Sequence, residues 1–68
     1  MKAQKITNVP TGVSLIGWSV YQTFPAILYK ENDSTIIVQS GDKVARITEC
    51  STKYKPANVI KKALEVLK

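Results

Sequence analysis

The chain contains no histidine and only one cysteine among its 68 residues. One cysteine cannot form a disulfide within the chain, and the usual zinc sites cannot be built without histidine. We therefore expect no metal and no cofactor. A single thiol is typical of a reducing compartment, so we predict a cytoplasmic protein.

Long apolar runs are also missing. No stretch is long or apolar enough to span a bilayer, and the first residues lack the apolar segment of a signal peptide. We therefore expect no membrane partner. Apolar residues make up 44% of the chain, which is typical of a folded domain. A domain of this size buries only about 60% of its unfolded surface, so self-association would supplement its stability.

Acidic residues are few. The chain has five acidic and ten basic residues, which gives a net charge of +5 and a pI near 9.6. This balance favours nucleic acid or an acidic protein as partner. Nine of the ten cations are lysines, so only Arg46 can make a bidentate guanidinium contact. Because no catalytic arrangement of residues stands out, we expect a binding protein and not an enzyme.

Two short turns organise the centre of the chain. Asn32-Asp33 and Gly41-Asp42 contain the residue types that tolerate the positive φ of tight hairpins. They predict a three-stranded antiparallel meander with strands at residues 26–31, 34–40 and 43–49.

The flanking segments complete an α+β domain over residues 13–68. Residues 13–21 are rich in β-branched and aromatic types and predict a strand. A bulge at Gly17 would bring its apolar side chains to one face: Val13, Leu15, Trp18 and Val20. The spacing of apolar residues predicts a C-terminal helix at 56–67. We expect about four curved, SH3-like strands with this helix packed on one face, and a polar arm or short edge strand at residues 1–12.

Counting outward from the two turns assigns the side chains of the meander to two faces. One face is wholly apolar: Ile27, Tyr29, Ile36, Val38, Ala45 and Ile47. The helix should pack on it with its apolar stripe of Val59, Ile60, Ala63, Leu64 and Leu67. The opposite face is mixed: Ala26, Leu28, Lys30, Thr35, Ile37, Gln39, Val44, Arg46 and Thr48.

The mixed face is the main candidate site, with two competing interpretations. Its polar residues could contact the phosphates and base edges of a nucleic acid: Lys30, Thr35, Gln39, Arg46 and Thr48. Its apolar residues could instead form the centre of a protein interface: Leu28, Ile37 and Val44. The second interpretation predicts an interaction module such as a small inhibitor, an adaptor or a subunit of a homo-oligomer. The residue types favour the two almost equally, and we place nucleic-acid binding first.

The start of the helix is a second candidate site. Lys53 and Lys55 lie at the positive end of the helix dipole, and Lys55 occupies the N-cap position. Free backbone N–H groups beside two ammonium groups would bind a phosphate. Alternatively these are exposed lysines, which the helix tolerates at a cost of about 0.3–1 kcal/mol. Lys2 and Lys5 on the N-terminal arm would add phosphate contacts.

Aromatic residues recur at every third position in Trp18, Tyr21 and Phe24. Exposed aromatic rings could stack on unpaired bases. In a chain with five aromatic residues, however, we expect Trp18 to lie in the core. Tyr21 and Phe24 are near a connection, and we expect them to be the more exposed pair.

Overall fold

The computed structural model describes residues 1–67 and contains five strands and one helix. These are β1 (Lys2–Ile6), β2 (Ser14–Tyr21), β3 (Phe24–Asn32), β4 (Thr35–Ser40), β5 (Lys43–Thr48) and α1 (Pro56–Leu67). The strands form one antiparallel sheet in the order β1-β5-β4-β3-β2. The sheet is open, because its edge strands β1 and β2 are not paired with each other. The N-terminal arm is therefore an edge strand, and the sheet has five strands where we expected about four.

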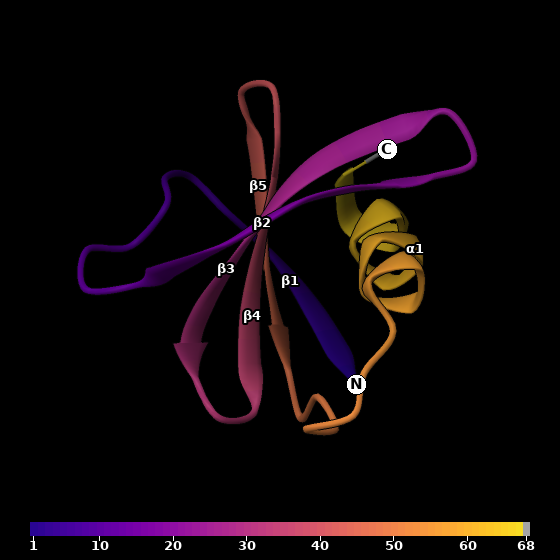
Figure 1. Cartoon of the computed structure of the whole chain (residues 1–68). Coiled ribbons are helices and arrows are strands. Elements are labelled where there is room, and N and C mark those ends of the chain that lie inside the picture. Colours follow the sequence, from indigo (N-terminus) through magenta and orange to yellow (C-terminus); the bar gives the residue numbers. More distant parts are fainter. Residues whose placement is uncertain (68) are drawn as a thin grey trace.

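Helix α1 covers one face of this sheet, which we call the helix face (Figure 1). It begins at Pro56 and ends at Leu67, as predicted, and it contacts both edge strands as well as β4 and β5. Its buried side chains are Val59, Ile60, Ala63 and Leu67. They pack against Ala26, Leu28, Ile36, Val38, Ala45 and Ile47 of the sheet. The predicted α+β architecture with a C-terminal helix on an antiparallel sheet is therefore confirmed.

The turn between β4 and β5 follows the prediction. Ser40 pairs with Lys43, so Gly41 and Asp42 form a two-residue loop. Gly41 adopts a φ of 62°, a left-handed conformation that glycine reaches without a steric penalty. The pairing of β4 with β5 matches the counted register along its whole length, including Ile37 opposite Arg46.

The turn between β3 and β4 lies one residue later than predicted. Asn32 pairs with Thr35, so the loop consists of Asp33 and Ser34. The Asn32 Oδ1 atom accepts a hydrogen bond of 3.0 Å from the backbone N–H of Ser34, a local bond that favours turns. Moving a two-residue loop by one position changes each cross-strand partner by two positions. The faces of β3 would stay the same if this were the only difference.

Glu31 is the residue that exchanges the two faces of β3 relative to the prediction. The register shifts between Lys30 and Asn32, which makes Glu31 the extra residue of a β-bulge. Side chains alternate between the two faces of a strand, so one extra residue sends every preceding side chain to the opposite face. The two turns did not reveal this bulge.

The bulge changes the composition of both faces. Leu28 lies opposite Val38 on the helix face, whereas Ile27 lies opposite Gln39 on the other face, which we call the outer face. The predicted assignment of Ile27 and Tyr29 to the core is therefore wrong. The same inversion moves three residues from the predicted mixed face to the helix side: Ala26, Leu28 and Lys30.

The bulge predicted at Gly17 is present in β2. The register shifts between Leu15 and Gly17, and Leu15 and Trp18 then pair with Tyr29 and Ile27. These partners belong to the outer face, so the side chains of Leu15, Trp18 and Val20 share it. The expectation that Trp18 lies in the core is wrong. Tyr21 and Phe24 have the opposite orientation and pack, half-buried, against the core around α1.

The connection at residues 7–13 covers part of the outer face. It must cross from one sheet edge to the other, and Figure 1 shows it (indigo to violet) on the side away from α1. Val9, Pro10 and Val13 of this connection are half-buried. Ile37 and Val44 of the outer face are fully buried although they lie outside the cluster around α1. Residues 7–13 thus lie on the side of the sheet on which Ile37 and Val44 are buried, while Leu15, Trp18, Val20 and Ile27 of β2 and β3 are exposed.

The inverted register predicts losses of stability that differ in size for two neighbouring substitutions. Leu28→Ala removes a side chain that is 2% exposed and should lower the free energy of unfolding by about 2–5 kcal/mol. Ile27→Ala removes an exposed side chain and should lower it by less than about 1 kcal/mol. Urea unfolding of the two variants measures both values. A larger loss for Ile27→Ala than for Leu28→Ala would contradict the register described above.

Candidate functional site

The apolar residues predicted for an interface are buried inside the domain. Leu28 belongs to the core under α1, and Ile37 and Val44 are buried on the outer face. None of the three is accessible to another molecule in this fold.

The polar residues of the predicted face are mostly engaged with their neighbours. Arg46 donates two hydrogen bonds to Glu31, from Nε to Oε1 at 3.0 Å and from Nη2 to Oε2 at 3.2 Å. This bidentate arrangement satisfies the guanidinium group and cancels its charge. The Tyr29 hydroxyl donates a hydrogen bond of 2.8 Å to the side-chain carbonyl of Gln39. The bulged position of Glu31 thus supplies the partner for the only arginine in the chain.

The outer ends of the strands show the same pattern. Lys30 Nζ lies 3.4 Å from a carboxylate oxygen of Asp33, and Lys2 Nζ lies 3.6 Å from one of Glu49. Thr35 is buried and Thr48 is half-buried. Exposed ion pairs of this kind add little stability, but they lower the charge that a phosphate backbone would meet.

The two lysines at the helix start are exposed, as predicted. The Lys55 carbonyl accepts hydrogen bonds from the backbone N–H groups of Asn58 (3.0 Å) and Val59 (3.2 Å), which confirms Lys55 as the N-cap. Lys53 and Lys55 border a shallow hollow of about 380 Å³ that also contains Glu49. A carboxylate that lines the same hollow reduces its attraction for an anion. The structure therefore does not bring the predicted nucleic-acid residues together on one surface.

The open part of the outer face carries a group of exposed apolar side chains that we call the β2 patch: Leu15, Trp18, Val20 and Ile27. Their exposed fractions are 68%, 74%, 45% and 39%, respectively. Trp18 and Ile27 are direct cross-strand partners, and Leu15 and Val20 flank Trp18 on the same face. The four side chains therefore form one continuous surface. The predicted bulge at Gly17 already placed Leu15, Trp18 and Val20 on one face. Their exposure was missed because Trp18 was expected to lie in the core.

Neither strand β2 nor the hollow beside Trp18 carries a charged side chain. Strand β2 has the sequence SLIGWSVY and contains no ionisable side chain except Tyr21, which faces the core. A hollow of about 300 Å³ lies beside Trp18. It is lined by Trp18, Pro25, Ala26, Ile27, Gln39, Ser40 and Gly41. The patch thus combines a protruding aromatic ring with an adjacent depression.

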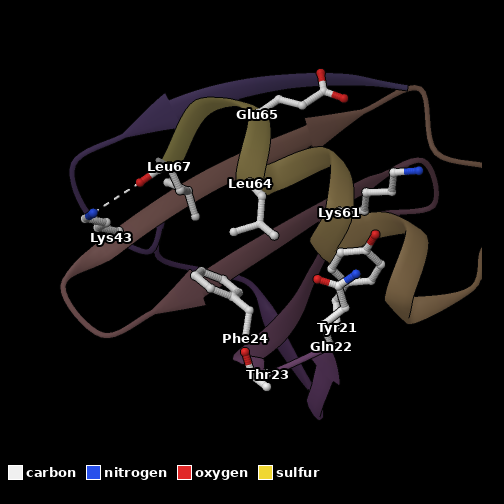
Figure 2. Close-up of a pocket in the computed structure, with 9 residues that line it drawn as sticks. All are labelled: Tyr21, Gln22, Thr23, Phe24, Lys43, Lys61, Leu64, Glu65 and Leu67. Carbon is white, nitrogen blue, oxygen red and sulfur yellow. Dashed lines mark hydrogen bonds between the residues drawn. The ribbon is translucent and has the colours of Figure 1, made fainter.

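A larger hollow of about 600 Å³ lies between the β2–β3 turn and the C-terminal half of α1 (Figure 2). Phe24 and Leu64 extend into the same space, and Lys43 Nζ donates a hydrogen bond of 3.2 Å to the backbone carbonyl of Leu67. The charged residues that line it are Lys43, Lys61 and Glu65.

Cys50, the only thiol, is buried at the end of β5. Desolvation raises the pKa of the thiol, and its Sγ lies 3.7 Å from the backbone carbonyl of Ile47. Both observations point to a packed structural side chain, because reactive cysteines need a stabilised thiolate.

Residues 1–67 contain no group of three histidine, cysteine or carboxylate side chains placed to hold a metal ion. In the same part of the chain, no helix is long and apolar enough to cross a membrane. Comparisons with protein-family models, curated proteins and solved structures found no match for this chain.

The burial of Cys50 predicts slow thiol chemistry. At pH 8 the raised pKa keeps the group protonated, and packing blocks access to sulfur. Reaction with a chromogenic disulfide reagent should be at least roughly tenfold slower in the folded protein than in denaturant. Equal rates in the two conditions would show that Cys50 is accessible.

Proposed function

We propose that this protein is a non-enzymatic protein-interaction module that binds its partner through the β2 patch. The observation that carries the proposal is the 74% exposure of Trp18 within a continuous apolar surface. The sequence analysis placed a protein-interaction module second and assigned its interface to Leu28, Ile37 and Val44. The proposal keeps this function and assigns the interface to the residues of the β2 patch.

The size of the patch supports the proposal. From the exposed fractions, the four side chains present roughly 400–500 Å² of apolar surface, which is as large as the main apolar patch of a typical monomer, and such patches are often functional. Tryptophan is also enriched among the residues that dominate binding energy, because a large rigid ring loses little entropy on binding. A surface with no role would be expected to carry polar side chains at these positions.

The balance of charges also supports a protein partner over nucleic acid. Stacking of bases on Trp18 would need cations nearby to hold the phosphates. The cation of the outer face nearest the sheet centre, Arg46, is neutralised by Glu31. Nucleic-acid binding, which the sequence placed first, becomes the second candidate. It is supported by the net charge of +5 and by Lys53, Lys55 and Lys61, for which no ion pair is found among residues 1–67. A cytoplasmic location accords with either function.

Photo-crosslinking tests the main proposal. Trp18 is replaced by benzoylphenylalanine, an aromatic residue that forms covalent bonds with nearby C–H groups when illuminated. We expect protein adducts from position 18 in cells that express the chain, because the patch is covered by a partner. The matched control places the same residue at Asn58, an exposed position on α1. Equal adduct yields from the two positions, or no adduct from position 18, would contradict the proposal.

A titration with fluorescently labelled duplex and single-stranded DNA tests the second candidate. Phosphate binding should weaken with salt, with a log–log slope of about −0.9 per phosphate neutralised on duplex DNA. We expect any such affinity to fall in the Lys53→Gln/Lys55→Gln variant and to be unchanged in Trp18→Ser. Tight binding that Trp18→Ser abolishes would instead assign the β2 patch to nucleic acid.

A further inference from the structure

We propose that the partner of the β2 patch is a second copy of this chain, which forms a symmetric dimer with the two patches packed face to face. This inference rests on the proposed function, since it names the partner of the same surface. In a two-fold symmetric interface the same surface patch serves both subunits, so the patch must be complementary to itself.

The charge distribution favours a second copy over a charged partner. The β2 patch carries no charged side chain, so it offers no attraction to an acidic protein. Two copies carry +5 each and repel one another over most of their surfaces. The repulsion is weakest where the approaching surfaces hold no cation, and the patch is such a surface.

The shape of the patch is also self-complementary. Trp18 protrudes from β2, and the 300 Å³ hollow lies directly beside it. When two copies face each other across a two-fold axis, the ring of each Trp18 enters the hollow of the other copy. The two indole rings then lie side by side, an arrangement in which aromatic pairs attract beyond the burial of their area. Because Ile27 lines the same hollow, it forms the wall against which the incoming ring packs.

The available area sets the strength of this dimer. Burying roughly 400–500 Å² of apolar surface on each copy gives a total of roughly 800–1,000 Å², which is the range of weak and transient complexes. We therefore expect a reversible dimer with a dissociation constant in the micromolar range. Association would also bury apolar surface for a domain too small to build a large core.

Sedimentation analysis from about 1 µM to 1 mM chain tests the proposal. The mass should rise from 7.5 kDa toward twice that value with increasing concentration. Trp18→Lys, which places a cation in the interface, should raise the dissociation constant at least about thirtyfold. The control Gln4→Lys adds the same charge to the outer face at the far edge strand and should leave association nearly unchanged. Since Trp18 is exposed, both variants should fold, which circular dichroism verifies.

Two spectroscopic readouts identify the residues in contact. The chain has one tryptophan, so an exciton couplet between two indoles in far-ultraviolet circular dichroism can arise only when two copies bring their Trp18 rings together. The couplet and a blue shift of Trp18 emission should grow with the dimer fraction. Salt should strengthen association slightly, because it screens repulsion between the positive copies.

The outcomes separate this inference from the proposed function. A chain that stays monomeric to 1 mM, or a dimer that Trp18→Lys leaves intact, overturns the inference. If position 18 crosslinks to a different protein while the chain is monomeric, the interaction module stands and the second copy is wrong. If no adduct forms and the chain is monomeric, both proposals fail.

Discussion

Residues 1–67 form a sheet with two faces and one helix that can cover only one of them. The other features of the protein follow from this constraint. Helix α1 covers the helix face from β1 to β2 and buries most of the large aliphatic side chains there. The outer face has only the seven-residue connection between the edge strands as a cover. On this face Ile37 of β4 and Val44 of β5 are buried, whereas Leu15, Trp18, Val20 and Ile27 of β2 and β3 are exposed. The exposed apolar patch is the uncovered remainder of a sheet that has apolar side chains on both faces.

Two bulges determine which side chains form the β2 patch. The bulge at Gly17 brings Leu15 onto the same face as Trp18, and the bulge at Glu31 turns Ile27 outward beside them. Without the second bulge, Leu28 would lie on the outer face and Ile27 in the core. The extra residue also places a carboxylate next to Arg46, so one irregularity both creates the apolar patch and neutralises the nearby cation. This coupling is one reason why we propose a protein as the partner and not a phosphate backbone.

The net positive charge is therefore spread away from the open sheet surface. Lys2, Lys30 and Arg46 each lie beside a carboxylate. Among the described residues, the lysines without such a partner are Lys5 on β1, Lys43 at the start of β5, Lys53 and Lys55 at the helix start, and Lys61 on α1. The charge thus acts on solubility and long-range repulsion. In the proposed function, recognition uses the neutral β2 patch, on which burial of apolar area would be the main driving force.

The sequence by itself determined the local elements. The helix bounds, the Gly41-Asp42 turn, the pairing of β4 with β5 and the Gly17 bulge all follow from residue types and short-range periodicity, and all are present. The sequence could not determine the bulge at Glu31, because glutamate carries no preference for an unpaired strand position and the Asn32-Asp33 pair suited a turn equally well.

Only the tertiary structure decided which faces are covered and by what. Exposure of Trp18 depends on the path of residues 7–13 across the sheet and on the placement of α1, which are contacts between segments far apart in the chain. A periodic pattern shows that side chains share a face, but the face becomes core or surface only when another segment packs on it.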